Sequence, residues 1–191
     1  MKLIVAVDAC WAIGKDGDQL CYIPPDLKRF QRLTTGHPVL LGRKTLATFP
    51  GGRPLKNRRN LILSTDPAFA PAGGEVFATL KAALAAAPAD TFVIGGASVY
   101  RQALAYCDTA YVTQIHRAFP AADCYFPNLA ADPAWEAVET EGPYRYEDLA
   151  YAYVTYRRRE RQIFSGNEEK RSRREELFLT VFWQERRTHP A

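Results

Sequence analysis

One ten-residue stretch, Thr91-Phe-Val-Ile-Gly-Gly-Ala-Ser-Val-Tyr100, constrains the fold of this 191-residue chain more than any other. Its first four residues are an apolar, β-branched run, which predicts a buried strand. After Gly95-Gly96, apolar residues recur at helical spacing, which predicts a helix that begins at once. A strand, two bare glycines and a helix N-terminus can bind a phosphate closely. The alternative is a tight strand-to-helix turn with positive φ. This stretch alone does not distinguish the two, so the choice depends on the residues at the ends of the other strands.

Short apolar runs and helical patterns alternate through the first hundred residues. The predicted strands are residues 2–7, 38–42, 60–64, 75–77, 91–94, 109–116, 135–141 and 149–156. Helices are predicted from the Pro24-Pro25 pair, from Arg43, over 79–87 with Thr79 as N-cap, and after Gly96. Residues 8–22 and 127–133 are expected to be loops, and Gly142-Pro143 a turn. This order predicts an α/β fold, a doubly wound and mainly parallel central sheet with antiparallel C-terminal edge strands.

Length and charge favour one folded body with a distinct tail. Residues 1–156 carry 15 Lys/Arg against 15 Asp/Glu, whereas residues 157–191 carry 10 against 6. A neutral body does not indicate a nucleic-acid partner. We expect a catalytic domain over 1–159 and an extension over 160–191. The extension combines a charged run, 168–176, with an apolar one, 177–183, which predicts docking on its own domain or on another copy. The body itself is expected to be a monomer.

Cysteine usage favours the cytoplasm. The four cysteines have no C-x-x-C spacing and no nearby histidine, which argues against a zinc site and against a disulfide framework; no metal is expected. The apolar run at residues 3–7 is too short for a signal peptide, and no segment approaches the length of a membrane span.

The helix that follows Pro24-Pro25 carries an unusual acid. Ile23, Leu27, Phe30 and Leu33 share one helical face, and Lys28, Arg29, Gln31 and Arg32 the other. Asp26 is the only charge predicted within the apolar arc. An aspartate in a first turn commonly caps a helix or complements its dipole. It can also be a carboxylate in an apolar cleft, where desolvation raises its pKa and a ligand must satisfy its charge.

Three strand ends carry phosphate-binding residue types. They are Gly42-Arg43-Lys44-Thr45, Ser64-Thr65 and Gly95-Gly96. Ligands bind beyond the carboxyl ends of strands in an open α/β sheet, so the three together predict a dinucleotide site. The two cations, without an obvious ribose-binding acid, favour NADPH over NADH. A solvated helix start is the alternative for Arg43-Lys44.

Nucleophilic catalysis by a side chain is poorly supported. The chain has three histidines, and none is paired with a serine elbow; the cysteines have no activating neighbour in sequence. We therefore expect the cofactor to supply the chemistry, while the protein supplies orientation and one proton-handling group.

Taken in order, residues 2–158 resemble dihydrofolate reductase of the bacterial chromosomal type. The resemblance is carried by Ile4-Val5-Ala6, Ala12 to Gly17, Ile23 to Phe30, Pro38 to Thr45, Arg53-Pro54-Leu55, Arg58, Asn60 to Ser64, Ile94-Gly95-Gly96, Val99-Tyr100 and Tyr111-Val112-Thr113. It implies reduction of 7,8-dihydrofolate to tetrahydrofolate, with hydride passing from nicotinamide C4 to pterin C6 and protonation at N5.

The resemblance also implies the role of each site residue. Asp26 would bind the pterin ring nitrogen and 2-amino group, with Thr113 bracing it, and Arg58 would bind the α-carboxylate of the glutamate tail. Residues 9–23 would form a mobile loop that closes over the nicotinamide. The remaining folate cleft would be lined by Ile4, Val5, Ala6, Leu27, Phe30, Phe49, Leu55 and Ile94. NADPH would lie along Ala6, Ile13, Gly14, Gly42, Arg43, Lys44, Thr45, Ser64, Thr65, Gly95, Gly96, Ala97, Ser98, Val99 and Tyr100. Dihydrofolate and antifolate-like molecules are the expected ligands.

Two positions depart from the family pattern. Cys21 stands where the family commonly has tryptophan, which affects a water-mediated contact to the pterin. Ser98 stands where many relatives carry an arginine beside the cofactor phosphate. Two alternative functions stay open: a pyrimidine reductase domain of riboflavin synthesis, which shares the fold but gives no reason for Asp26 beside Phe30, and a non-catalytic nucleotide-binding module.

Overall fold

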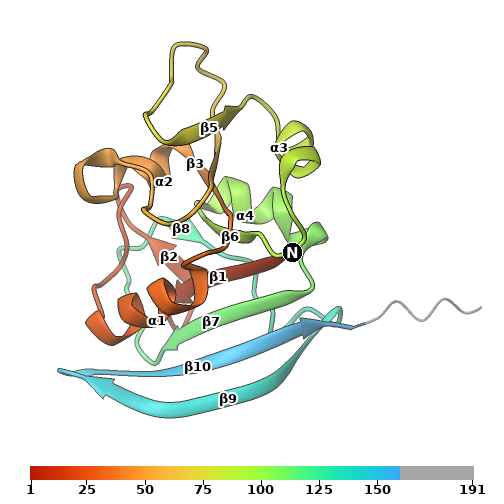
Figure 1. Cartoon of the computed structure of the whole chain (residues 1–191). Coiled ribbons are helices and arrows are strands. Elements are labelled where there is room, and N and C mark those ends of the chain that lie inside the picture. Colours follow the sequence, from red (N-terminus) through yellow and green to blue (C-terminus); the bar gives the residue numbers. More distant parts are fainter. Residues whose placement is uncertain (160–191) are drawn as a thin grey trace, which may run out of the picture. The chain divides into compact units, whose positions relative to one another are not determined.

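The computed structural model describes residues 1–159, and within them the central sheet has eight strands (Figure 1). Their spatial order is β5-β4-β3-β6-β1-β7-β10-β9. All neighbours from β5 to β7 run parallel, and β10 is antiparallel to both β7 and β9. The strands are β1 Lys2–Val7, β3 Val39–Gly42, β4 Asn60–Leu63, β5 Gly74–Phe77, β6 Phe92–Gly95, β7 Thr109–Ile115, β9 Trp135–Tyr146 and β10 Leu149–Arg158. The predicted fold class is confirmed.

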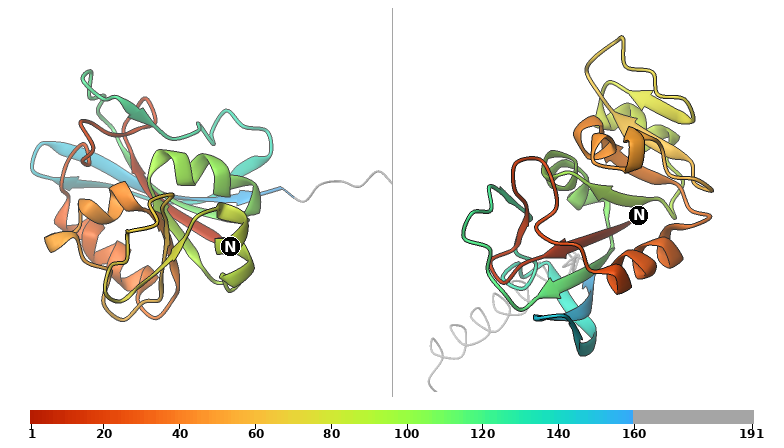
Figure 2. Two further views of the ribbon diagram at one scale, coloured as in Figure 1. Left: turned by 90° about the horizontal axis from the view of Figure 1, so that it is seen from above. Right: turned by 90° about the vertical axis from the view of Figure 1, so that its left-hand side faces the viewer.

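Helices lie on both faces of this sheet, as Figure 2 shows for α1 and α4 on opposite sides of β1. The described helices are α1 Pro24–Thr34, α2 Arg43–Ala47, α3 Leu80–Ala86 and α4 Ala97–Ala103, with 3-10 turns η1 Pro50–Gly52 and η2 Leu104–Tyr106. The Thr79 hydroxyl accepts a hydrogen bond from the Ala82 N–H (3.2 Å), which confirms the predicted cap of α3.

Each face of the sheet has its own apolar core. Along β1, Leu3, Val5 and Val7 pack into the cluster shared with α3 and α4, whereas Ile4 packs into the cluster shared with α1 and α2. This alternation is the two-residue period of a strand buried on both sides. The C-terminal half of β1 therefore lies between α1 on one face of the sheet and the start of α4 on the other.

Two local predictions were wrong. Gly142-Pro143 is not a turn, because β9 continues through it, and the chain reverses at Glu147 and Asp148 instead. Proline is tolerated there because β9 is an edge strand and needs no donor on its outer side. The expected loop 8–22 contains the short strand β2 (Ala12–Gly14), which pairs with β8 (Cys124–Tyr125).

Further sequence predictions have separate outcomes. The four cysteines are free. No helix within residues 1–159 is long and apolar enough to cross a membrane. The extension 160–191, with its charged and apolar runs, lies outside the described residues.

Candidate active site

A cleft of about 1400 Å³ lies at the carboxyl ends of β1, β3, β4 and β6. Every residue that the sequence assigned to substrate or cofactor lines it, from Ile4 on β1 to Thr113 on β7. Four segments far apart in the chain (4–6, 42–45, 64–65 and 94–100) thus meet at one place. The sheet topology brings them together, because parallel strands present their carboxyl ends at the same edge.

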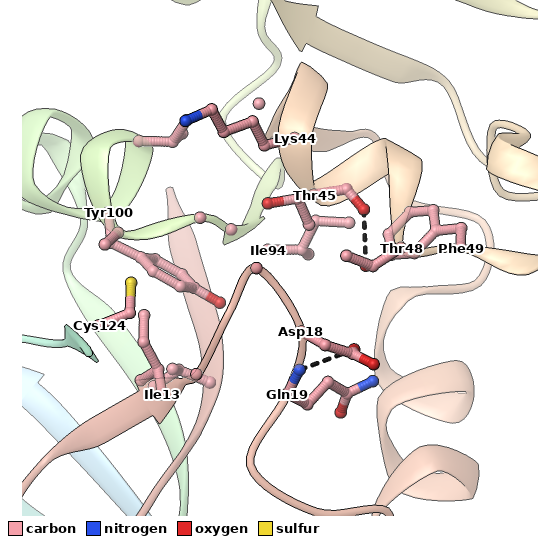
Figure 3. A pocket seen from close by; sticks show the side chains of 18 of the residues that line it. Ile13, Asp18, Gln19, Lys44, Thr45, Thr48, Phe49, Ile94, Tyr100 and Cys124 are labelled. Atoms are coloured by element: carbon pink, nitrogen blue, oxygen red, sulfur yellow. Dashed lines mark hydrogen bonds between the residues drawn. The ribbon is translucent and has the colours of Figure 1, made fainter. Parts of the chain in front are cut away.

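Figure 3 shows two walls that face each other across this cleft. One comes from α2 and the turn after it, where Lys44, Thr45, Thr48 and Phe49 are labelled; Lys44 extends toward α4. The other comes from the β1–α1 loop. The Tyr100 ring lies between the two, and its hydroxyl donates to the Ile4 carbonyl (2.7 Å), which ties α4 to β1.

Asp26, the acid singled out in the sequence, lies partly buried in the first turn of α1 and lines the cleft. Its Oδ1 accepts a hydrogen bond from the Thr113 hydroxyl on β7 (2.5 Å). The side chain makes no capping bond to α1, whose N-cap position is Ile23 without a side-chain cap. The carboxylate therefore faces a ligand-sized space.

The environment of Asp26 opposes its ionisation. Burial raises the pKa of Asp26 above its usual value, and the Thr113 hydrogen bond and the Arg29 guanidinium partly offset this rise. Arg29 is one placement that the sequence got wrong: it was expected on the face of α1 away from the apolar residues, yet it is 7% exposed. A carboxyl group with a raised pKa beside an apolar cleft is a typical proton-handling group.

The diglycine leaves space that a side chain would fill. Gly95 has φ +137°, and a Cβ there would lie 3.1 Å from Thr45 Cγ2. A Cβ on Gly96 would lie 3.0 Å from Thr45 Oγ1. The bare backbone, the Thr45 hydroxyl and the start of α4 together fit a diphosphate, which needs close backbone approach and hydrogen-bond donors.

The adjoining strand ends supply positive charge and hydroxyls. Arg43 Nη1 lies 3.1 Å from Asp66 Oδ2 in an exposed ion pair, and the Ser64 hydroxyl accepts from the Asp66 N–H (3.2 Å). Asp66 is an acid at the end of β4 that the sequence analysis did not weigh. It holds the guanidinium of Arg43 at the edge of the cleft.

Arg58 lies at the opposite end of the cleft, fixed against the C-terminal end of α1. Its Nε donates to Thr34 Oγ1 (3.0 Å) and its Nη2 to Thr35 Oγ1 (3.0 Å), and Nη1 donates to the Lys56 carbonyl (2.8 Å). Burial lowers the pKa of Arg58 from its usual value, but the group stays a cation. A guanidinium held in this way can bind a carboxylate without first being ordered.

The β1–α1 loop is anchored at both of its sides. Asp8, which is 1% exposed, accepts hydrogen bonds from the Cys10 and Ala12 N–H groups (2.7 and 2.9 Å) and from the Phe119 N–H (2.8 Å). Further along, the Asp16 N–H donates to Asp123 Oδ2 (2.9 Å). The loop segment 17–22 between these anchors and α1 lines the cleft.

Comparisons with known proteins identify the family. The sequence model described as dihydrofolate reductase matches residues 1–158. The dihydrofolate reductase of Bacillus subtilis is 38% identical over 160 residues, covering 79% of this chain and 93% of the relative. The chain belongs to the dihydrofolate reductase family.

Other dihydrofolate reductases match as extensively. That of Mycobacterium leprae is 35% identical, covering 82% of this chain and 96% of the relative. The structure of dihydrofolate reductase from Enterococcus faecalis, complexed with NADP(H) and RAB-propyl, is similar with a TM-score of 0.74 and 34% identity. It covers 83% of this chain and 96% of that chain.

The two departures from the dihydrofolate reductase pattern both lie in the cleft. Cys21 is partly buried, and burial, followed by the nearby charge of Asp26, raises its pKa, so it is a neutral thiol. Ser98 is bonded within α4: Gln102 Nε2 donates to its hydroxyl (3.0 Å) and to its carbonyl (3.1 Å). Neither position therefore supplies a charged side chain to the dihydrofolate reductase cleft.

Sequence reasoning missed several residues that line the cleft, including Gln31, Thr48, Leu80, Gln102, Ile115 and Cys124. No local pattern distinguishes these residues, since they reach the cleft through the path of the chain. Gln102 is the exception. It follows Ser98 by four residues, the spacing at which helical side chains meet.

Proposed function

We propose that this chain reduces 7,8-dihydrofolate to 5,6,7,8-tetrahydrofolate with NADPH. The observation that carries the proposal is the Asp26–Thr113 pair inside an apolar cleft that continues to the diglycine edge. A single carboxylate with a raised pKa suits a substrate that needs one proton and one hydride. Membership of the dihydrofolate reductase family supports the same reaction.

Substrate binding is assigned to the half of the cleft beside α1. Asp26 accepts hydrogen bonds from the pterin ring nitrogen and 2-amino group, while Thr113 holds the carboxylate in place. Arg58 binds the α-carboxylate of the glutamate tail, which its fixed geometry supports. Apolar side chains enclose the pterin and the ring that follows it: Ile4, Val5, Ala6, Leu27, Phe30, Phe49, Leu55 and Ile94.

Cofactor binding is assigned to the other half. Gly95 and Gly96, with Thr45 opposite them, receive the diphosphate, and Arg43 with Ser64 receives the 2′-phosphate. When bound, NADPH supplies the hydride. Further contacts are assigned to Ala6, Ile13, Gly14, Gly42, Lys44, Thr65, Ala97, Ser98, Val99 and Tyr100, all of which line the cleft.

The protein's part in the chemistry is to orient the pterin and to handle a proton. Asp26 fixes which face and which edge of the pterin meets the nicotinamide side, so that C6 is the carbon that accepts hydride. The carboxyl oxygens bind the edge of the pterin opposite N5 and do not contact N5 directly. The carboxyl group therefore favours protonation of N5 through water. The loop 9–23 excludes bulk water when it closes.

The catalytic domain is assigned to residues 1–159, and residues 160–191 to an extension of unassigned role. Four free thiols are typical of a reducing compartment, which supports a cytoplasmic location. We assign a monomeric state to the catalytic domain.

The test is NADPH oxidation by the purified chain with and without dihydrofolate. Turnover that requires dihydrofolate is expected, and it should fall when Asp26 is replaced by asparagine. Cofactor binding without any turnover would instead support the nucleotide-binding module. Turnover with an aminopyrimidine ribose phosphate, but not with dihydrofolate, would support the riboflavin-pathway reductase.

A further inference from the structure

Arg29 is the most deeply buried basic side chain of α1. It is 7% exposed, and its Nη1 atom has no hydrogen-bond partner among residues 1–159. A buried guanidinium nitrogen without a hydrogen bond is costly unless another interaction compensates for the lost water. Its position on the inner face of α1 therefore calls for a physical reason.

Aromatic rings from the sheet supply that compensation. The Arg29 guanidinium carbon lies 4.1 Å from the ring centroid of Tyr153 on β10 and 5.7 Å from that of Tyr111 on β7. Tyr153 in turn packs against Tyr144 and Tyr151, with ring centroids 5.3 and 5.5 Å apart. Aromatic faces attract a cation without cancelling its charge. Because Arg29 is buried, water screens this positive charge only weakly.

This charge lies next to the acid of the active site. Arg29 follows Asp26 by three residues in α1, so the two project from adjacent positions on the helix. Thr113, which donates to Asp26, is paired directly with Tyr153, the ring under Arg29, in the β7–β10 ladder. Within the described chain, Asp26 and Arg29 do not form a close ion pair, so the carboxylate oxygens are not occupied by the guanidinium.

We propose that Arg29 is a positioning residue whose buried charge opposes the effect of burial and favours the ionised form of Asp26 before substrate binds. A salt bridge would achieve this only by occupying the oxygens that the pterin needs. A cation held on tyrosine faces behind the carboxylate acts through space and leaves those oxygens free. The effect of Arg29 on the charge of Asp26 does not depend on the proposed function, whereas its effect on turnover rests on that function.

The other groups around Asp26 do not supply this charge. Thr113 is neutral. Cys21 and Tyr153 are weak acids whose pKa values are raised, in both cases chiefly by burial. Arg117 acts on Cys21 and is paired with the exposed Asp148 (2.7 Å). Arg29 is the cation that lowers the pKa of Asp26 against the effect of burial.

The experiment measures the pKa of Asp26 directly, by carbon NMR of the aspartate carboxyl groups in the full chain without ligand. Arg29→Gln should raise that pKa by about one pH unit. Arg29→Lys keeps a positive charge and should change it much less. Arg32→Gln, an exposed arginine one turn away in sequence, is the matched control and should leave it unchanged. Arg29→Met, which retains packing along the stem, replaces Arg29→Gln if the latter fails to fold.

The second readout is the pH profile of dihydrofolate turnover. In Arg29→Gln, the acidic limb, where protonation of Asp26 removes the form that binds the pterin, should move in the same direction as the pKa of Asp26, toward higher pH. An unchanged pKa in both neutral variants would overturn the role of Arg29 and leave the proposed function intact. A wild-type chain that does not turn over dihydrofolate would instead refute the proposed function, and the NMR titration would still decide the role of Arg29.

Discussion

Replacing Asp26 with asparagine separates the charge of this side chain from its shape. Asparagine keeps an oxygen that can accept the Thr113 hydrogen bond, so the local geometry of α1 and β7 should be retained. The carboxylate charge and one of the two acceptor oxygens are lost. Activity and stability are expected to move in opposite directions.

The loss of activity follows from the hydrogen bonds assigned to the carboxylate. A hydrogen bond to a charged group contributes about 1.5–3 kcal/mol, and two such bonds to the pterin are proposed. Because asparagine retains a weaker neutral interaction, we expect a loss of about 3–4 kcal/mol in transition-state stabilisation. That is a fall of roughly 10²- to 10³-fold in kcat/KM. Part of it should be recovered at low pH, where dihydrofolate arrives already protonated.

The gain in stability follows from the raised pKa of Asp26. Below the unfolded value of 3.8, the carboxyl is protonated in both states and its replacement changes little. As pH rises from there through the folded pKa, the folded wild type resists ionisation and loses stability relative to its unfolded chain. Each pH unit between the two pKa values is worth about 1.4 kcal/mol. Asp26→Asn should therefore be more stable than wild type at neutral pH, and not at pH 3.

Two assays measure these effects. Steady-state NADPH oxidation over a pH series gives kcat/KM, and urea unfolding of the ligand-free chain at pH 3 and pH 7 gives the stability difference. Thr113→Val is a matched control, since it removes the partner and leaves the charge. Near-normal turnover of Asp26→Asn at neutral pH would refute the catalytic role. A variant less stable than wild type at pH 7 would refute the desolvation account.

Three further substitutions test other parts of the cleft. Gly95→Ala places a Cβ against Thr45 at a φ that alanine rarely adopts, so NADPH affinity, measured by fluorescence titration, should fall by at least about tenfold and stability by about 1–3 kcal/mol. Arg58→Lys should raise KM for dihydrofolate about tenfold while kcat changes little; an equal effect on a pterin substrate without the glutamate tail would contradict carboxylate binding. Asp66→Asn frees Arg43 from its ion pair and should tighten NADPH about two- to fivefold relative to NADH in calorimetric titrations, whereas equal changes for both cofactors would exclude a 2′-phosphate contact.

The sequence predicted the sheet well because its strands carry local signals. Residues 92–95 and 61–63 are short apolar runs, and both lie in strands buried on two faces. The site followed from the strand ends, since parallel strands deliver their carboxyl ends to one edge. Every predicted site residue lines the cleft, whereas the role of each residue stays a prediction.

The misplaced features depend on pairing partners that lie outside the residues carrying each local pattern. β2 has three residues and exists because β8, over a hundred residues later, pairs with it. Gly142-Pro143 has the composition of a turn. However, β9 stays paired with the long strand β10 on both sides of this dipeptide, with a register shift between Tyr151 and Tyr153. A local pattern carries no information about such partners.

Arg29 shows why one helical face was not enough to describe α1. The apolar arc was drawn as a single face with Asp26 as its only charge, which assumes that the helix packs against one surface. α1 meets two: the cleft, lined by Asp26, Leu27 and Phe30, and the aromatic rings of β7 and β10, which receive Arg29. Successive inner positions of the helix thus carry opposite charges to different neighbours, one acid toward the ligand and one base toward the sheet. A base buried behind the acid can set its charge state without competing for the ligand, which no residue on the cleft side could do.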